Sequence, residues 1–151
     1  MNKSSFDIPV VLFTFKRSNT VERILKVLKQ VNVSKLYLFS DGGRDEDEQE
    51  LVNKARIDIM QMIDWKCEVI KMFAESNQGV FNQIAMGAKR VFEKESKAIF
   101  LEDDNLPEPS FFSYSTLISL IAYPWLIAIY ISLINLFDFG VHLLIILPPF
   151  Q

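Results

Sequence analysis

The stretch Ala98-Ile-Phe-Leu-Glu-Asp-Asp104 joins a short apolar run directly to three consecutive carboxylates. An apolar run of this length, bounded by turn residues, is typical of a buried strand in a parallel sheet. Adjacent negative charges repel one another, so a folded chain retains them where water or a cation compensates. Hard oxygen ligands at the end of a strand suit Mg²⁺ or Mn²⁺. Taken alone, the triplet is explained as well by a hydrated acidic turn, so its meaning depends on the rest of the chain.

Three earlier segments have the same strand character as Ala98–Leu101. They are rich in β-branched and aromatic residues and cover residues 8–15, 36–39 and 67–73. Segments with apolar residues at helical spacing lie between the strands and predict three helices. The alternation of strands and helices predicts an α/β fold, with a Rossmann-like parallel sheet covered by helices on both faces.

The predicted helices carry sequence signals for their starts and their buried faces. Asn19 followed by Glu22 resembles a capping box, and Asp45 followed by Glu48 can cap the second helix. The apolar faces of the second and third helices are predicted from their apolar residues. These predicted faces include Leu51, Val80 and Phe81.

Polar residues follow each predicted strand, and parallel strands bring these positions to one edge of the sheet. In open α/β sheets, ligands bind beyond the carboxyl ends of the strands. Each residue alone has a simple structural explanation, such as a turn, a cap or a surface charge, but together they predict a binding site. The residues are Thr14, Lys16, Arg17, Ser40, Asp41, Glu75, Asn77, Gln78, Glu102, Asp103 and Asp104.

No glycine-rich phosphate loop follows the first predicted strand. The residues Lys16-Arg-Ser-Asn19 match neither G-x-G-x-x-G nor G-x-x-x-x-G-K. A nucleotide at this edge would need another group to neutralise its diphosphate, and a divalent cation held by a carboxylate after Leu101 would serve. Asp41 can accept hydrogen bonds from a base or ribose, and Arg17 can donate them. The site is suited to transfer of a group from a nucleotide diphosphate.

Three motifs resemble the nucleotide-sugar-binding half of the GT-A fold glycosyltransferases. They are Pro9-Val-Val-Leu-Phe-Thr-Phe-Lys-Arg17, Phe39-Ser-Asp-Gly-Gly43 and Phe100-Leu-Glu-Asp-Asp-Asn-Leu-Pro-Glu-Pro-Ser-Phe-Phe112. The sequence is most similar to bacterial sugar transferases and to the eukaryotic N-acetylglucosaminyltransferase that initiates complex N-glycans. The acidic triplet is this family's form of the D-x-D motif.

The resemblance implies a role for each member of the acidic triplet. Asp104 would ligate Mn²⁺ or Mg²⁺, and Asp103 would contact the ribose of the donor. Glu102 would contact the donor sugar or a group that surrounds the metal. The implied activity is metal-dependent binding of a nucleotide diphosphate sugar for glycosyl transfer.

The resemblance also implies how the nucleotide is held. Arg17 and Asp41 would bind the base, which the family resemblance suggests is uracil, so the expected ligand is a UDP-sugar. Asn77 and Gly79 would shape the floor of the pocket beneath the donor. No residue is identified as a catalytic base, and the acceptor remains unassigned.

Composition excludes several other classes of function. The chain has 151 residues and a formal net charge of −3, and no basic patch with interleaved aromatic residues occurs, so no nucleic-acid partner is expected. Cys67 is the only cysteine, which fits a reducing compartment. The first residues do not resemble a secretory signal, so the expected location is cytoplasmic, with membrane association as an option.

The charge pattern divides the sequence into a domain of residues 1–114 and a hydrophobic tail of residues 115–151. After Phe111 the only charged residue is Asp138. The stretch 117–137 is long and apolar enough for a membrane-spanning helix, but it lacks flanking Lys and Arg residues. The tail is a membrane segment, a segment docked on the sheet, or the product of a frameshift or truncation, which the abrupt change favours. We then expect donor binding without transfer, since the acceptor half and the general base are missing.

Two other functions compete with donor binding. A receiver-like signalling module would need an acidic pair after the first strand and a phosphoacceptor Asp after the third. The chain has Lys16-Arg17 and Glu75 at those places, which argues against such a module. A membrane-tethered binding or assembly protein without catalysis is the second alternative, and it requires the tail to be a functional membrane segment.

Overall fold

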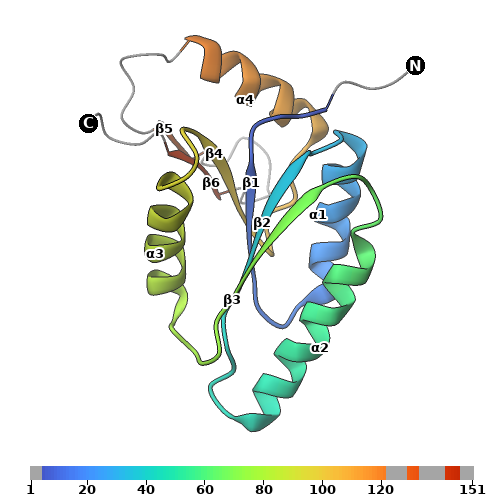
Figure 1. The fold of residues 1–151 in the computed structure, drawn as a ribbon. Coiled ribbons are helices and arrows are strands. Elements are labelled where there is room, and N and C mark those ends of the chain that lie inside the picture. The colour runs from blue at the N-terminus through green and yellow to red at the C-terminus, as the bar shows by residue number, and fades with distance from the viewer. Residues whose placement is uncertain (1–4, 122–128, 133–141, 147–151) are drawn as a thin grey trace.

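The computed structural model describes residues 5–121, 129–132 and 142–146, and it shows an α/β fold (Figure 1). Four parallel strands lie in the order β3-β2-β1-β4, an order found in doubly wound α/β folds. The four predicted strands are confirmed. They are β1 (Val10–Thr14), β2 (Lys35–Ser40), β3 (Glu68–Phe73) and β4 (Ala98–Glu102).

Three helices connect these strands and cover both faces of the sheet, as the sequence predicts. They are α1 (Ser18–Gln30), α2 (Glu46–Met62) and α3 (Val80–Phe92). Figure 1 shows α1 and α2 on one side of the sheet and α3 on the other. Alternate residues of each strand point to opposite faces, so Leu12 packs with α1 and α2, whereas Val11 packs with Val91 of α3.

The C-terminal part of the described chain contains a helix and two short strands. Helix α4 (Pro109–Ile121) runs through the predicted domain boundary at residues 114–115, and its Phe112 is buried in the core beside α1. Strand β6 (His142–Ile146) pairs antiparallel with β4, and β5 (Ile129–Ser132) pairs antiparallel with β6.

The described residues contain no helix that is both long and apolar enough to cross a membrane. Within the stretch 117–137, residues 117–121 belong to α4 and Ile129–Ser132 form β5. The remaining residues of that stretch, and most of the predicted tail, lie outside the described residues.

Two predictions about helix starts have different outcomes. Asp45 caps α2 as predicted, because its side chain accepts a hydrogen bond from the Glu48 amide. The capping box at Asn19 is wrong. Helix α1 begins at Ser18 after Arg17, without a side-chain cap, and the Asn19 side chain accepts a hydrogen bond from the neighbouring Thr20 amide.

Three large apolar residues predicted to be buried are exposed instead. Leu51 is exposed because the buried face of α2 follows Glu48, Val52, Ala55 and Ile59, which leaves Leu51 beside that face. Val80 and Phe81 are exposed because the buried residues of α3, Gly87 and Val91, lie in its second half. The first turn of α3 is therefore available to shape the site at the edge of the sheet.

Candidate functional site

A pocket of about 510 Å³ lies at the carboxyl edge of the parallel strands. Its lining comes from β1, β2 and β4, from the loops that follow all four parallel strands, and from the first half of α3. Six of the seven predicted site residues line it, and the exception is Asp104. The six are Arg17, Asp41, Asn77, Gly79, Glu102 and Asp103.

Asp41, at the end of β2, anchors one side of the pocket. Its Oδ1 accepts hydrogen bonds from the amides of Gly42 (2.9 Å) and Gln78 (2.8 Å) and from Gln83 Nε2 (3.1 Å). Its Oδ2 accepts from the Gly79 amide (2.9 Å) and from Asn77 Nδ2 (3.2 Å). We call Asp41, Asn77, Gly79 and Gln83 the amide wall. Every donor to this carboxylate is neutral, so Asp41 fastens the loop before α3 to the end of β2.

Two glycines shape the loops of the amide wall, one through a close approach and the other through its backbone angle. A Cβ atom on Gly42 would lie 2.5–2.8 Å from backbone atoms of Ser76, a separation that real Cβ atoms do not tolerate. Gly79 has φ +79°, in the region that favours glycine. The absence of a side chain at Gly42 therefore permits the contact between the two loops.

Arg56 of α2 supports the amide wall from behind. Its Nε donates to Ser40 Oγ (2.9 Å), and its Nη2 donates to the carbonyl oxygens of Ser40 (3.1 Å), Asp41 (3.0 Å) and Ala74 (2.7 Å). The guanidinium also lies 4.9 Å from the ring centroid of Phe73. Burial lowers the pKa of Arg56. Because it joins the ends of β2 and β3, Arg56 fixes the edge on which Asp41 sits.

The opposite side of the pocket is built from ion pairs. Arg17, just before α1, binds both carboxylate oxygens of Asp103 through Nε (3.2 Å) and Nη2. The Asp103 side chain is only 8 % exposed, whereas that of Arg17 is 53 % exposed. The hydrogen bond and charge of Asp103 raise the pKa of Arg17. We call Lys16, Arg17, Arg44 and Asp103 the ionic wall.

Lys16 and Arg44 share a second, buried carboxylate at this wall. Glu48 Oε1 accepts from Lys16 Nζ (2.8 Å) and Arg44 Nη2 (2.6 Å). Glu48 Oε2 accepts from Nε (2.8 Å) and the amide (3.0 Å) of Arg44. These contacts hold the pKa of Glu48 well below its usual range. Glu48 thus fastens the loop after β1 to the loop after β2.

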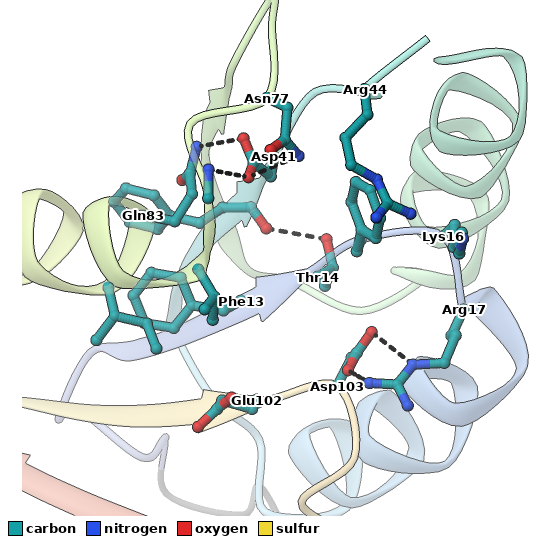
Figure 2. Close-up of a pocket in the computed structure, with 15 residues that line it drawn as sticks. Phe13, Thr14, Lys16, Arg17, Asp41, Arg44, Asn77, Gln83, Glu102 and Asp103 are labelled. Carbon is teal, nitrogen blue, oxygen red and sulfur yellow. Dashed lines mark hydrogen bonds and ion pairs between the residues drawn. The ribbon is translucent and has the colours of Figure 1, made fainter. Parts of the chain in front are cut away.

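Figure 2 shows how the two walls face one pocket. Asp41, Asn77 and Gln83 gather on one side, while Lys16, Arg17 and Arg44 lie on the other. Asp103 lies beside Arg17, and Glu102, the last residue of β4, also lines the pocket. Aromatic and aliphatic side chains form the rest of the surface, so a flat ring has apolar groups to pack against. These side chains are Phe13, Phe15, Phe39, Val80 and Ile84.

The aromatic part of the pocket is held by α3. The rings of Phe13 and Phe39 lie 5.1 Å apart, centroid to centroid. A Cβ atom on Gly87 would lie 2.9 Å from the Phe13 ring and 3.1 Å from the Phe39 ring. The absence of a side chain at Gly87 lets α3 pack directly on these rings. Thr14 Oγ1 donates to the Phe39 carbonyl (2.9 Å) and ties β1 to β2 at the same level.

The remaining predicted rim residues lie beside the pocket. The Asp104 side chain is 58 % exposed, and its Oδ2 lies 3.8 Å from Arg17 Nη2. Ser40 is buried under Arg56, Gln78 supplies its amide to Asp41, and Glu75 is exposed. The structure also adds three polar residues that the sequence did not single out as a site: Arg44, Gln83 and the supporting Arg56.

The carboxylates at the end of β4 are the natural place to consider a metal. Within residues 5–121, 129–132 and 142–146, no three His, Cys, Asp or Glu side chains converge on a point that could hold one. Mg²⁺ is usually bound by one or two carboxylates together with substrate phosphates, so a complete protein cage is not required. The exposed Asp104, next to Asp103, fits this kind of partial site.

No model of a known protein family matches the sequence, and a comparison with curated proteins finds no similar sequence. The relation to glycosyltransferases therefore stays a prediction from the three sequence motifs.

Proposed function

We propose that the pocket binds the nucleotide diphosphate sugar donor of a GT-A type glycosyltransferase, with a UDP-sugar as the expected ligand. The observation that carries this proposal is the meeting of Arg17, Asp41 and Glu102-Asp103 in one pocket of about 510 Å³. These residues come from three of the motifs that resemble the family. They are separated widely in sequence, so their meeting does not follow from any one motif.

The two walls suit different parts of such a donor. The side chains of Phe13, Phe15, Val80 and Ile84 offer an apolar surface for a base, with the amides of Asn77 and Gln83 beside it. The cations of the ionic wall suit a diphosphate, since guanidinium and ammonium groups bind phosphoryl oxygens. Asp41 already accepts five hydrogen bonds from the protein, so its main role in the proposal is to hold the amide wall in shape.

A divalent cation, Mn²⁺ or Mg²⁺, completes the proposed donor site. Asp104 would ligate it, with Asp103 next to it in the chain. When bound, the cation would neutralise the diphosphate and stabilise it as a leaving group. The chain's own residues bind and orient the donor. Arg17 holds Asp103 in the pocket wall, and Asp41 holds the loop before α3.

Calorimetric titration with UDP in the presence and absence of Mn²⁺ tests the proposal. We expect UDP to bind the wild-type chain about tenfold more tightly with Mn²⁺ than with EDTA, because the cation bridges carboxylate and phosphates. The Asp104→Asn variant should lose this dependence on Mn²⁺. No binding at millimolar UDP with Mn²⁺, by a protein whose circular dichroism shows that it is folded, would refute donor binding.

Asp64→Asn is the matched control for Asp104→Asn. The two carboxylates are similarly exposed, at 59 % for Asp64 and 58 % for Asp104, but Asp64 pairs with Lys29 away from the pocket. The control variant should keep the full Mn²⁺ dependence. Equal losses in both variants would mean that the effect comes from net charge and not from a metal ligand.

A further inference from the structure

We infer that Lys16 and Arg44, held together by Glu48, form a phosphate-binding position that works without a metal. The inference rests on the proposed function, because it assigns a contact to the phosphates of the same donor. It deepens that function, since it names the two cations that bind the phosphates, gives Glu48 the role of positioning them, and expects binding without a metal. The position lies on the ionic wall, with Lys16 and Arg44 near each other in Figure 2.

The geometry of Glu48 indicates that the two cations are positioned and not simply exposed at the surface. The Glu48 side chain is 7 % exposed and lies in the first turn of α2. It contacts Lys16 from the loop after β1 and Arg44 from the loop after β2. Glu48 therefore fixes the ammonium group of Lys16 and the guanidinium group of Arg44 at the pocket. Because these groups are already held in place, less conformational entropy is lost when a ligand binds.

The charge of this cluster favours an anionic ligand. One carboxylate faces two cations, so the three side chains together carry a net positive charge. The side chains of Lys16 and Arg44 remain 41 % and 67 % exposed. Two of the five N–H donors of the Arg44 side chain bind Glu48, and its other three have no hydrogen-bond partner among the residues that the structure describes. These donors can bind phosphoryl oxygens.

The other groups of the pocket are less suited to this role. Arg17 binds both oxygens of Asp103, and this carboxylate accepts no hydrogen bond from Lys16 or Arg44, so the pair carries no net charge. The donors of the amide wall that surround Asp41 are committed to that carboxylate. Lys16 and Arg44 therefore differ from Arg17 in that two cations share the single carboxylate of Glu48, whereas Arg17 and Asp103 pair one to one.

Titration with pyrophosphate in EDTA tests this position directly, because the probe lacks a base and the solution lacks free metal. We expect the wild-type chain to bind pyrophosphate and UDP in EDTA, with affinity that falls as NaCl is raised. The Lys16→Met/Arg44→Met double variant should lose about tenfold or more in both affinities, since each lost contact is a charge-assisted hydrogen bond. Uridine, which carries no phosphate, should bind both proteins equally.

Lys29→Met is the matched control. Lys29 also forms an ion pair with a carboxylate, Asp64, but it lies away from the pocket, so this variant should bind pyrophosphate as the wild type does. If the double variant does not fold because Glu48 is left unpaired, a triple variant that adds Glu48→Leu replaces it. Binding by the double or triple variant equal to that of the wild type would overturn the inference.

This test separates the two proposals. Binding of UDP with Mn²⁺ but no binding of pyrophosphate or UDP in EDTA would overturn the metal-free position and leave donor binding intact. Binding of pyrophosphate in EDTA that the double variant loses, without any response to Mn²⁺, would support the phosphate position and refute the metal-dependent donor site. Glu48→Gln adds a test of positioning. The substitution removes a negative charge beside the two cations, which by itself would strengthen pyrophosphate binding. A fall in affinity would therefore support positioning of the cations by Glu48, and an unchanged or higher affinity would overturn it.

Discussion

The amide wall and the ionic wall of the pocket both centre on a carboxylate at the carboxyl edge of the sheet, but the partners differ. Asp41 accepts hydrogen bonds from neutral amides only, three of them from the backbone. Asp103 and Glu48 instead bind cations, namely Arg17, Lys16 and Arg44. A carboxylate that accepts hydrogen bonds from backbone amides fixes the positions of the loops that carry those amides. A carboxylate that binds exposed cations fixes the positions of their positive charges at the pocket. The first arrangement is expected to carry stability, and the second to carry ligand binding.

The same substitution at the two walls should give the largest difference. Asp41→Asn should lower the free energy of unfolding by about 2–3 kcal/mol. The asparagine side chain has an NH₂ group in place of one carboxylate oxygen, and in either orientation this group faces at least two N–H donors that lose their acceptor. Asp103→Asn should lower it by less than about 1 kcal/mol, because the half-exposed Arg17 can turn to solvent. Urea denaturation followed by circular dichroism measures both. Equal losses would mean that the two walls do not differ in this way.

Close packing behind the amide wall gives the next effect. Gly42→Ala should cost about 2 kcal/mol, since its Cβ would overlap backbone atoms of Ser76 that cannot move independently. Gly87→Ala is the comparison variant. Its Cβ meets the rings of Phe13 and Phe39, and alanine favours the helix by about 1 kcal/mol, so the two effects partly cancel. Thermal denaturation of both variants checks this order, and a larger loss at Gly87 would contradict it.

The support of the ionic wall depends on the start of α2. Asp45→Ala should cost about 1 kcal/mol, because it removes the cap that fixes the turn containing Glu48. Asn19→Ala should change stability by less than about 0.5 kcal/mol, because Asn19 does not cap α1. Chemical denaturation of the pair measures this difference. A cost at Asn19 as large as that at Asp45 would show that the predicted capping box forms in solution.

The smallest effect is a pH dependence at Glu48. The pKa of Glu48 in the folded chain lies below its ordinary value of 4.5. The ion pairs of Glu48 therefore stabilise the folded chain above pH 4.5, and this stabilisation decreases as the pH falls below that value. The difference in unfolding free energy between the wild type and Glu48→Gln should therefore be constant near neutral pH and shrink in acid. Denaturation at a series of pH values measures it. A difference that does not change with pH would contradict the ion pairing.

Local sequence patterns were sufficient to predict most elements of the fold. The strand at Ala98–Glu102 and the cap at Asp45 followed from neighbouring residues, because periodicity and capping are local properties. The errors at Leu51 and Val80 have a different origin. Burial depends on which part of a helix meets the sheet, and that is set by packing between elements.

The site was partly predictable for the same reason. Parallel strands bring Arg17, Asp41 and Asp103 to one edge, so their meeting in a pocket could be expected from the order of strands. The spacing of Arg44 and Glu48, four residues apart near a helix start, is a signal that could have revealed their ion pair. No local signal marks Arg56, whose partners lie up to 18 residues away in sequence.

The sequence by itself determined the order of strands and helices, the edge that collects polar side chains, and the glycines that its turns require. Only the tertiary structure decided that Asp41 serves as an anchor for the loop before α3 and that Glu48 joins Lys16 to Arg44. The physical reason is that a carboxylate takes its role from the donors around it. Those donors come from loops that only the folded sheet brings together.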